Sequence, residues 1–193
     1  MPREKKVTRE EILRAAAEVV RTEGKERLSV RGVAGVIGCS TQPVYSCFAG
    51  GIAELERALY EAALGEYRAR IEGYLMEQKY PQYMAYGMGF VRFAREEKGL
   101  FRYLFFSERE EVVLDPLFDD IADVIAAAYH TDVETARSFH TDMAIFSYGL
   151  GALVNTGHPM SEEEVAKAFQ REFFALYGYY FPDRPKFWLK GGA

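Results

Sequence analysis

Residues 29–48 read Ser-Val-Arg-Gly-Val-Ala-Gly-Val-Ile-Gly-Cys-Ser-Thr-Gln-Pro-Val-Tyr-Ser-Cys-Phe, and this stretch predicts two short helices joined by a tight turn. Ser29 is a suitable N-cap for the first helix, and Gly38 suits the left-handed residue that would end it. We expect Ser40 to cap the second helix. Helices this short are unstable alone, so they need a third helix to pack on, which residues 8–23 supply.

The helix predicted over residues 8–23 begins with a capping box, because Glu11 follows three residues after Thr8. Val44 and Phe48 are four residues apart, so they form one apolar face of the last short helix. Three helices with a glycine-containing turn before the last one are typical of helix-turn-helix domains. Such domains place their last helix in the major groove of DNA.

As a set, these features resemble the DNA-binding domain of TetR-family transcriptional regulators over residues 8–60. The resemblance is carried, in chain order, by Ile12, Ala15, Ala16, Val20, Gly24, Ser29-Val30-Arg31, Val33-Ala34, Gly38, Ser40, Val44-Tyr45-x-x-Phe48, Leu55 and Leu59. It implies an all-α fold of about nine helices. Residues 1–51 would form a helix-turn-helix DNA-binding domain, and residues 52–193 a helical effector-binding and dimerisation domain.

The resemblance also implies a function. Family members are ligand-responsive transcriptional regulators, usually repressors, that bind a near-palindromic DNA operator as homodimers. A small effector, here expected to be apolar or aromatic, releases them. The resemblance implies a cytoplasmic protein without catalytic residues, metal or cofactor.

Candidate DNA contacts lie on and around the predicted recognition helix, which runs over residues 41–48. Gln42 can read adenine through paired hydrogen bonds. Tyr45 resembles the family's phosphate-contacting tyrosine, and Arg31 is the charged candidate, with a solvated surface residue as its alternative. The full set of candidates is Arg9, Ser29, Arg31, Ser40, Thr41, Gln42, Pro43, Tyr45 and Ser46. Met1–Val7 is basic and is either a frayed tail or an arm that lies along DNA.

The chain departs from the family pattern in one place. Family members often carry lysines after the final aromatic residue, whereas Ala49-Gly50-Gly51 follow Phe48 here. The predicted recognition helix also contains no Lys or Arg. An alternative function therefore stays open, namely a helical interaction or structural protein whose N-terminal domain, residues 1–51, no longer binds DNA.

Charge is divided unevenly along the chain. The 193 residues carry a net charge of −5, which alone argues against binding to nucleic acid. Residues 1–48 hold nine Lys or Arg and six Asp or Glu, giving +3, whereas residues 49–193 hold 15 and 23, giving −8. A basic N-terminal region followed by an acidic remainder suits local contact with phosphates. An excess of only three positive charges also arises by chance.

Cysteine and hydropathy patterns exclude several other classes of protein. Cys39 and Cys47 lack zinc-ligand spacing and have no histidine nearby, which favours a reduced, cytoplasmic environment. Residues 1–11 are too charged for a signal peptide. Residues 143–161 contain no formal charge, but Gly157 and Pro159 interrupt them, so we expect a helix buried in protein and no membrane span.

Six further helices are predicted after residue 51. They cover residues 52–78, 81–98 and 100–106, a stretch from Asp115-Pro116 to Ala128, and residues 132–156 and 162–181. Gly99 is expected to break the chain between two of them. Thr131-x-x-Glu134 and Ser161-x-x-Glu164 predict capping boxes for the last two. No stretch shows sustained strand alternation.

The last two predicted helices resemble the pair with which family members dimerise. Small residues would let helices approach closely, and an apolar stripe would fill the interface. The candidates are Gly149, Gly151, Ala152, Phe169, Phe173, Leu176 and Tyr180. The alternative is that both helices pack wholly within one monomer.

An effector pocket is expected in the second domain. Its candidates are Tyr86, Phe90, Phe93, Phe101, Tyr103, Phe105, Ile121, Ile125, His140, Met143, Phe146 and Ser147. The excess of aromatic residues near Met and Gly favours a cavity for an apolar or flat ligand, although such stripes are also typical of plain core. His140 and Asn155 are the polar candidates to orient the ligand, with a hydrogen-bonded core or surface histidine as the alternative for His140.

An enzyme is the rival class, and its usual motifs are missing. The three histidines show no His-Glu-x-x-His pattern, and Gly149-x-Gly151 lies in a predicted helix with no preceding strand. No catalytic elbow or phosphate loop is present. The sequence therefore predicts a protein that is not an enzyme.

Overall fold

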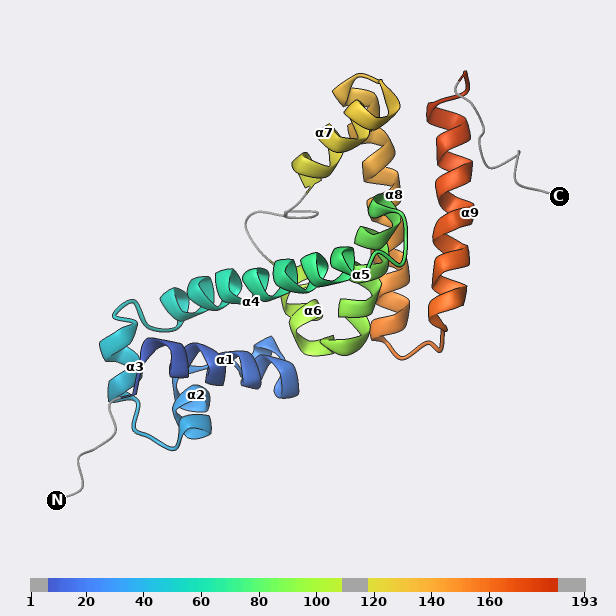
Figure 1. Ribbon diagram of the computed structural model, residues 1–193. Helices are drawn as coiled ribbons and strands as arrows, with labels where there is room; N and C mark the ends of the chain where they lie inside the picture. Colours follow the sequence, from blue (N-terminus) through green and yellow to red (C-terminus); the bar gives the residue numbers. More distant parts are fainter. Residues whose placement is uncertain (1–6, 109–117, 184–193) are drawn as a thin grey trace. The chain divides into compact units, whose positions relative to one another are not determined.

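The computed structural model describes residues 7–108 and 118–183, which form nine α-helices, one short 3-10 helix and no strand (Figure 1). The prediction of an all-α fold is confirmed. The helices are α1 (Arg9–Glu23), η1 (Lys25–Arg27), α2 (Val30–Ile37), α3 (Gln42–Cys47), α4 (Gly51–Met76), α5 (Gln82–Glu96), α6 (Lys98–Phe105), α7 (Phe118–Tyr129), α8 (Val133–Asn155) and α9 (Glu162–Tyr180). The predicted basic arm, apart from Val7, and the predicted helix start at Asp115-Pro116 lie outside the described residues.

Helix boundaries follow the caps that the sequence predicts at four places. Thr8 and Ser161 each form a complete capping box with the glutamate three residues later. The Ser29 hydroxyl accepts a hydrogen bond from the Gly32 N–H at 3.0 Å and starts α2. Gly38 ends that helix in the left-handed region, at φ 77° and ψ 34°. These four caps depend only on local sequence.

Two predicted caps are wrong. The N-cap of α3 is Thr41, not Ser40, and its side chain makes no capping hydrogen bond. Pro43, the second residue of α3, has no N–H to donate to a cap. At α8, Asp132 replaces Thr131 as the N-cap, because its carboxylate accepts from both the Thr135 N–H and the Thr135 hydroxyl at 2.8 Å. A carboxylate with two donors is a stronger cap than a hydroxyl.

Gly99 does not break the chain, contrary to our prediction, but lies inside α6. A Cβ atom at Gly99 would lie 2.5 Å from the carbonyl oxygen of Val20 and 2.6 Å from the Cα of Arg21. This residue therefore lets the start of α6 lie directly against the backbone of α1. Glycine is needed here for close approach and not for helix termination.

The chain divides into two compact units. The first contains the described residues within 1–73 and 96–110, and the second those within 74–95 and 111–193. The packing boundary thus differs from the predicted functional boundary at residue 51, because most of α4 and all of α6 belong to the first unit. The predicted division into a DNA-binding domain and an effector domain remains a prediction.

The first unit is built around α1. Its apolar face, which includes Ile12 and Ala16, is buried together with Val33 of α2, Val44 of α3 and Leu55 of α4. Charged groups join three of its elements at one side. The Arg21 guanidinium of α1 binds the Glu66 carboxylate of α4 at 2.6 Å and the Glu97 carboxylate before α6 at 3.0 Å.

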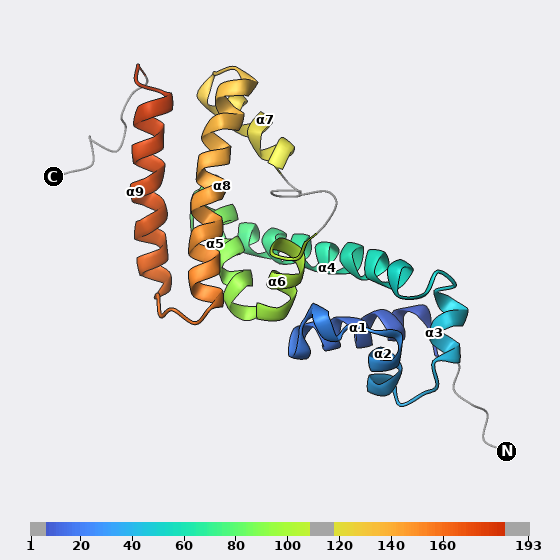
Figure 2. The same cartoon turned by 180° about the vertical axis from the view of Figure 1, so that it is seen from behind.

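The second unit contains α7, α8 and α9 with most of α5. Both views of the ribbon show α8 and α9 running side by side (Figures 1 and 2). Phe139 of α8 is fully buried, and its ring lies 5.7 Å from that of Phe173 and 6.4 Å from that of Tyr129. The buried Asn155 amide donates to the carbonyl oxygen of Ala94 at 3.0 Å, which ties the end of α8 to α5.

None of the described helices has both the length and the hydropathy that crossing a bilayer requires. No group of three or more His, Cys, Asp or Glu side chains is arranged to hold a metal ion within residues 7–108 and 118–183.

Candidate functional site

The short helix α3 presents a polar face to solvent while its apolar face is anchored. Val44 and Phe48 are fully buried in the first unit. On the opposite face Gln42 and Ser46 are exposed, and half of the Tyr45 surface is accessible. A helix held this way displays short, uncharged hydrogen-bonding groups and one phenol, which is the chemistry of base-edge and phosphate contacts.

The other predicted DNA contacts close to α3 in the sequence differ in how exposed they are. Arg31 on α2 is exposed and forms no hydrogen bond or ion pair with any other described residue. Ser40 is also exposed, and Thr41 and Pro43 are half-buried. Ser29 already has a structural task as the cap of α2. Of the predicted contacts, Arg31 is the one whose charge is available to a phosphate.

Arg9 has three partners within the first unit. Its guanidinium donates to the carbonyl oxygen of Cys47 at 2.9 Å, lies 3.5 Å from the Glu54 carboxylate and stacks 4.1 Å above the centre of the Phe48 ring. These contacts join the start of α1 to the end of α3. They give Arg9 a structural task, and its predicted contact with DNA stays a prediction.

The Ala49-Gly50-Gly51 turn lies where the family pattern has lysines, and an acidic side chain of α4 binds its backbone. The Glu54 carboxylate accepts from the Gly50 N–H at 2.9 Å. This hydrogen bond, helped by Arg9, holds the pKa of Glu54 below its usual value. A negative charge therefore follows α3 directly, which weakens attraction to phosphate at this point.

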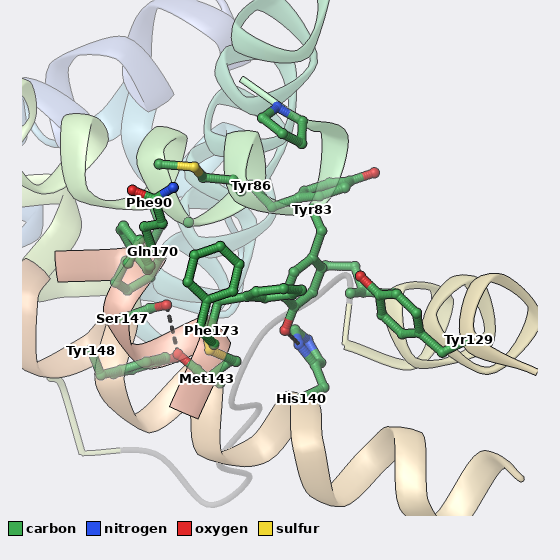
Figure 3. A pocket seen from close by; sticks show the side chains of 17 residues that line it. Tyr83, Tyr86, Phe90, Tyr129, His140, Met143, Ser147, Tyr148, Gln170 and Phe173 are labelled. Atoms are coloured by element: carbon green, nitrogen blue, oxygen red, sulfur yellow. Dashed lines mark hydrogen bonds between the residues drawn. The ribbon is translucent and has the colours of Figure 1, made fainter. Parts of the chain in front are cut away.

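A cavity of about 240 Å³ lies in the second unit between α5, α7, α8 and α9 (Figure 3). Its wall is mainly aromatic. The lining residues are Pro81, Tyr83, Met84, Tyr86, Gly87, Phe90, Ile121, Tyr129, His140, Met143, Ala144, Ser147, Tyr148, Phe169, Gln170, Phe173 and Phe174. None of them is Asp, Glu, Lys or Arg.

Half of the predicted pocket residues line this cavity. They are Tyr86, Phe90, Ile121, His140, Met143 and Ser147. Phe93 and Ile125 are buried in the core but do not line the cavity, and the Phe146 ring packs against Phe169 at 5.8 Å. Asn155 also lies away from the lining, because it binds Ala94.

Three predicted pocket residues belong to the first unit and do not line this cavity. Phe101 is fully buried in the first unit, and the Tyr103 hydroxyl donates to the Glu56 carbonyl oxygen at 2.9 Å. The Phe105 ring lies 5.2 Å from that of Tyr67. The aromatic residues of α6 therefore serve the core around α1 and α4, which no local pattern reveals.

Several lining residues were not among the predicted pocket residues. Tyr83 lies three residues before Tyr86 and seven before Phe90, so helical spacing alone places the three on one face of α5. Phe169 and Phe173, which we expected at a dimer interface, also line the cavity. Tyr129 and Gln170 carry no comparable signal, because only the packing of α7 and α9 brings them there.

The best-defined polar contact of the cavity joins α5 to α8. The Tyr83 hydroxyl lies 3.0 Å from Nδ1 of His140, and Figure 3 shows the two side chains meeting. Only 6% of the His140 surface is accessible, and this burial lowers its pKa to about 4. His140 is therefore neutral at physiological pH. Ser147 is occupied differently, because its hydroxyl donates to the Met143 carbonyl oxygen at 2.7 Å.

Helix α8 carries an exposed apolar stripe. Ile145, Gly149 and Leu153 recur every four residues, and 60% of Ile145 and 48% of Leu153 are accessible. Of the other predicted interface residues, Gly151 is buried and Ala152 is half-buried. An apolar stripe exposed on one chain is typical of a surface that another helix covers.

The predicted interface residues on α9 mostly face inward. Phe169 is buried, and Phe173, Leu176 and Tyr180 are half-buried. The Tyr180 hydroxyl donates to the Asp142 carboxylate at 2.6 Å, and this hydrogen bond raises the pKa of Tyr180 to about 12. Phe169, Phe173 and Tyr180 join α9 to α8 within one chain. The predicted dimer contact through the four residues stays a prediction.

No protein-family model matches the chain, and no curated protein matches it significantly. A functional assignment therefore has to be argued from the residues and their geometry.

Proposed function

We propose that this protein is a ligand-responsive, DNA-binding transcriptional regulator that acts as a homodimer and works as a repressor. In this proposal α2 and α3 form a helix-turn-helix resembling that of TetR-family regulators. The cavity in the second unit takes a small apolar or aromatic effector. The stripe of Ile145, Gly149 and Leu153 on α8 forms part of the dimer interface.

The observation that carries the proposal is the two-faced character of α3. A six-residue helix cannot persist in water by itself, so its position depends on the buried Val44 and Phe48. Once anchored, it exposes Gln42, Tyr45 and Ser46 on one side. Arg31, on the preceding helix, adds a positive charge that no described residue neutralises.

Effector binding would act through a population shift. A ligand changes an equilibrium between two conformations only by its difference in affinity for them. In one conformation of the proposed dimer, the distance between the two helix-turn-helix units would not match the operator. An effector that binds this conformation better would lower the affinity for DNA. Helix α4 supplies residues to both compact units, and α5 also crosses the boundary at its last residue, so continuous helix links the two units.

One observation favours a second function. Helix α3 bears no charge, and the Glu54 carboxylate occupies the N–H of Gly50 directly after it. A surface without positive charge next to a carboxylate is better suited to contact with another protein than to contact with the DNA backbone. The alternative is therefore a helical interaction protein that no longer binds DNA.

Salt-dependent DNA binding separates the two functions. A DNA site recovered from the protein's own genome would be labelled, and its affinity measured by fluorescence anisotropy over a range of salt concentrations. Because Arg31 would bind a phosphate, Arg31→Ala should weaken binding to all sequences and flatten the slope of log affinity against log salt by about one per subunit. Because Gln42 would read a base, Gln42→Ala should change sequence preference by about 1–3 kcal/mol.

Arg68→Ala is the matched control, because Arg68 is an exposed arginine of α4 outside the proposed surface. It should leave both affinity and slope unchanged. Equal effects of Arg31→Ala and Arg68→Ala would reject our assignment of the surface. No salt-dependent binding by the unmodified protein would favour the interaction protein.

A further inference from the structure

The lining of the cavity in the second unit restricts the charge of its ligand. Its 17 lining residues include no acidic or basic side chain apart from the neutral His140. Asp142, one residue before Met143 on α8, already accepts a hydrogen bond from Tyr180 at 2.6 Å. Burying a charge without a partner is very costly. A ligand that enters this cavity should therefore be uncharged.

The shape and composition of the cavity restrict the ligand further. A cavity of about 150 Å³ holds one benzene molecule, so about 240 Å³ suits one or two fused rings. Rings line it on several sides, and those of Phe90 and Tyr148 lie 5.0 Å apart. Edge and offset contacts between such rings and a planar ligand are favourable.

Gly87 shapes one wall of the cavity. A Cβ atom there would lie 2.7 Å from two carbon atoms of the Phe169 ring. The glycine thus lets this ring of α9 lie close to the backbone of α5. A bulkier residue would push the ring away from α5 and change the space left for a ligand.

Hydroxyl groups supply the polar contacts of the cavity. The Tyr83 hydroxyl and His140 Nδ1 form a neutral hydrogen-bonded pair at 3.0 Å. Tyr86 and Tyr129 also line the cavity, and neither hydroxyl forms a hydrogen bond with another described residue. Burial raises the pKa of Tyr129, so its hydroxyl stays protonated and able to donate. A ligand with one small polar group can be oriented by these phenols.

We propose that the cavity binds an uncharged, planar molecule of one or two fused rings whose hydroxyl, carbonyl or ring N–H group is oriented by Tyr83, His140 and Tyr129. This inference deepens the proposed function, because it names the chemical class of the effector. Carboxylates and phosphates are disfavoured in the cavity, because no Lys or Arg among its lining residues would pair with their negative charge.

Matched probes test the inference directly. The full-length protein would be titrated with 2-naphthol, indole and 2-naphthoate at about pH 7 by calorimetry, with ligand-detected NMR as a second readout. The carboxylate of 2-naphthoate is ionised at this pH, whereas 2-naphthol is neutral. We expect 2-naphthol or indole to bind, and 2-naphthoate to bind at least about tenfold more weakly than 2-naphthol, because the cavity offers its charge no partner.

Variants locate the binding site. Ala144→Phe, which fills the cavity, should abolish binding of the neutral probes, with circular dichroism showing that the helices remain. Tyr83→Phe should weaken 2-naphthol binding by about three- to tenfold, because one hydrogen bond is lost. Tyr179→Phe is the matched control, since Tyr179 is largely exposed on α9 and does not line the cavity.

The inference is overturned if no neutral probe binds, if 2-naphthoate binds as tightly as 2-naphthol, or if Ala144→Phe leaves binding intact. These readouts require no DNA. A protein that binds the neutral probes but never binds DNA would contradict the proposed regulator and retain this ligand class. A protein that binds DNA but prefers the charged probe would contradict this ligand class and retain the proposed regulator.

Discussion

His140 shows how one buried side chain determines both the chemistry of the cavity and the acid stability of the protein. Burial lowers its pKa from 6.5 to about 4. As the pH falls through 6.5, the unfolded chain takes up a proton at this residue that the folded chain does not accept until about pH 4. The contribution of His140 to stability is therefore complete above pH 6.5 and is lost as the pH falls to about 4.

His140→Gln should remove this pH dependence. Over that interval the free energy of unfolding of the unmodified protein should fall relative to the variant by about 3 kcal/mol, measured by urea unfolding at several pH values. Glu54, Asp132, Glu162 and Glu164 also have lowered pKa values, but they titrate in both proteins and cancel in the difference. Parallel curves for the unmodified protein and His140→Gln would contradict this account of His140.

Sequence reasoning at the residue scale succeeds where a role depends on near neighbours along the chain. The cap at Ser29 and the left-handed Gly38 are examples. It fails where the role depends on a distant partner. Nothing local indicates that Arg9 binds the Cys47 carbonyl oxygen 38 residues away, or that Tyr83 meets His140.

At the scale of elements, the contact between α6 and α1 depends on one missing side chain. Gly99→Ala should lower the free energy of unfolding by about 2 kcal/mol, because its Cβ would lie 2.5 Å from a backbone oxygen that cannot easily move. Gly65→Ala is the matched control, since Gly65 is an exposed helix residue of α4 with open space around it. That change should be neutral or should stabilise by up to about 1 kcal/mol.

Chemical unfolding of both variants measures the difference. If Gly99→Ala proves as stable as Gly65→Ala, α6 does not lie against α1 as described. Helix propensity alone predicts that alanine would stabilise both positions, because glycine disfavours a helix wherever it lies. Only the tertiary contact distinguishes the two glycines.

Missing knowledge of tertiary contacts also explains why only half of the predicted pocket residues line the cavity. Helical spacing identified Tyr86 and Phe90 on α5, and it also favoured the aromatic residues of α6. Periodicity shows that a helix has an apolar face, but not which neighbour covers that face. Phe101, Tyr103 and Phe105 pack in the first unit, while Phe169 and Phe173 of α9 line the cavity.

For the whole molecule, the exposed stripe on α8 predicts self-association. Ile145→Glu should convert dimers into monomers, because it would bury a charge at the centre of the interface. Met76→Glu is the control, since Met76 is 80% exposed at the end of α4 and lies outside the stripe. Sedimentation velocity over a range of concentrations distinguishes the two species. Dimers that persist in Ile145→Glu would place the interface elsewhere, and an unmodified protein that is always monomeric would contradict dimerisation.

The central claim is that a pair of anchored α3 helices reads DNA, and the DNA that the purified protein retains tests it most directly. Sheared DNA from its own genome would be incubated with the protein at moderate salt, and the retained fragments sequenced. We predict enrichment of a near-palindromic site whose half-sites lie about one helical turn, or a multiple of it, apart. At the same salt concentration, Arg31→Ala should retain fewer fragments, whereas Arg68→Ala should retain as many as the unmodified protein. Retention of no fragments, or of fragments without a shared two-fold symmetric site, would contradict the claim.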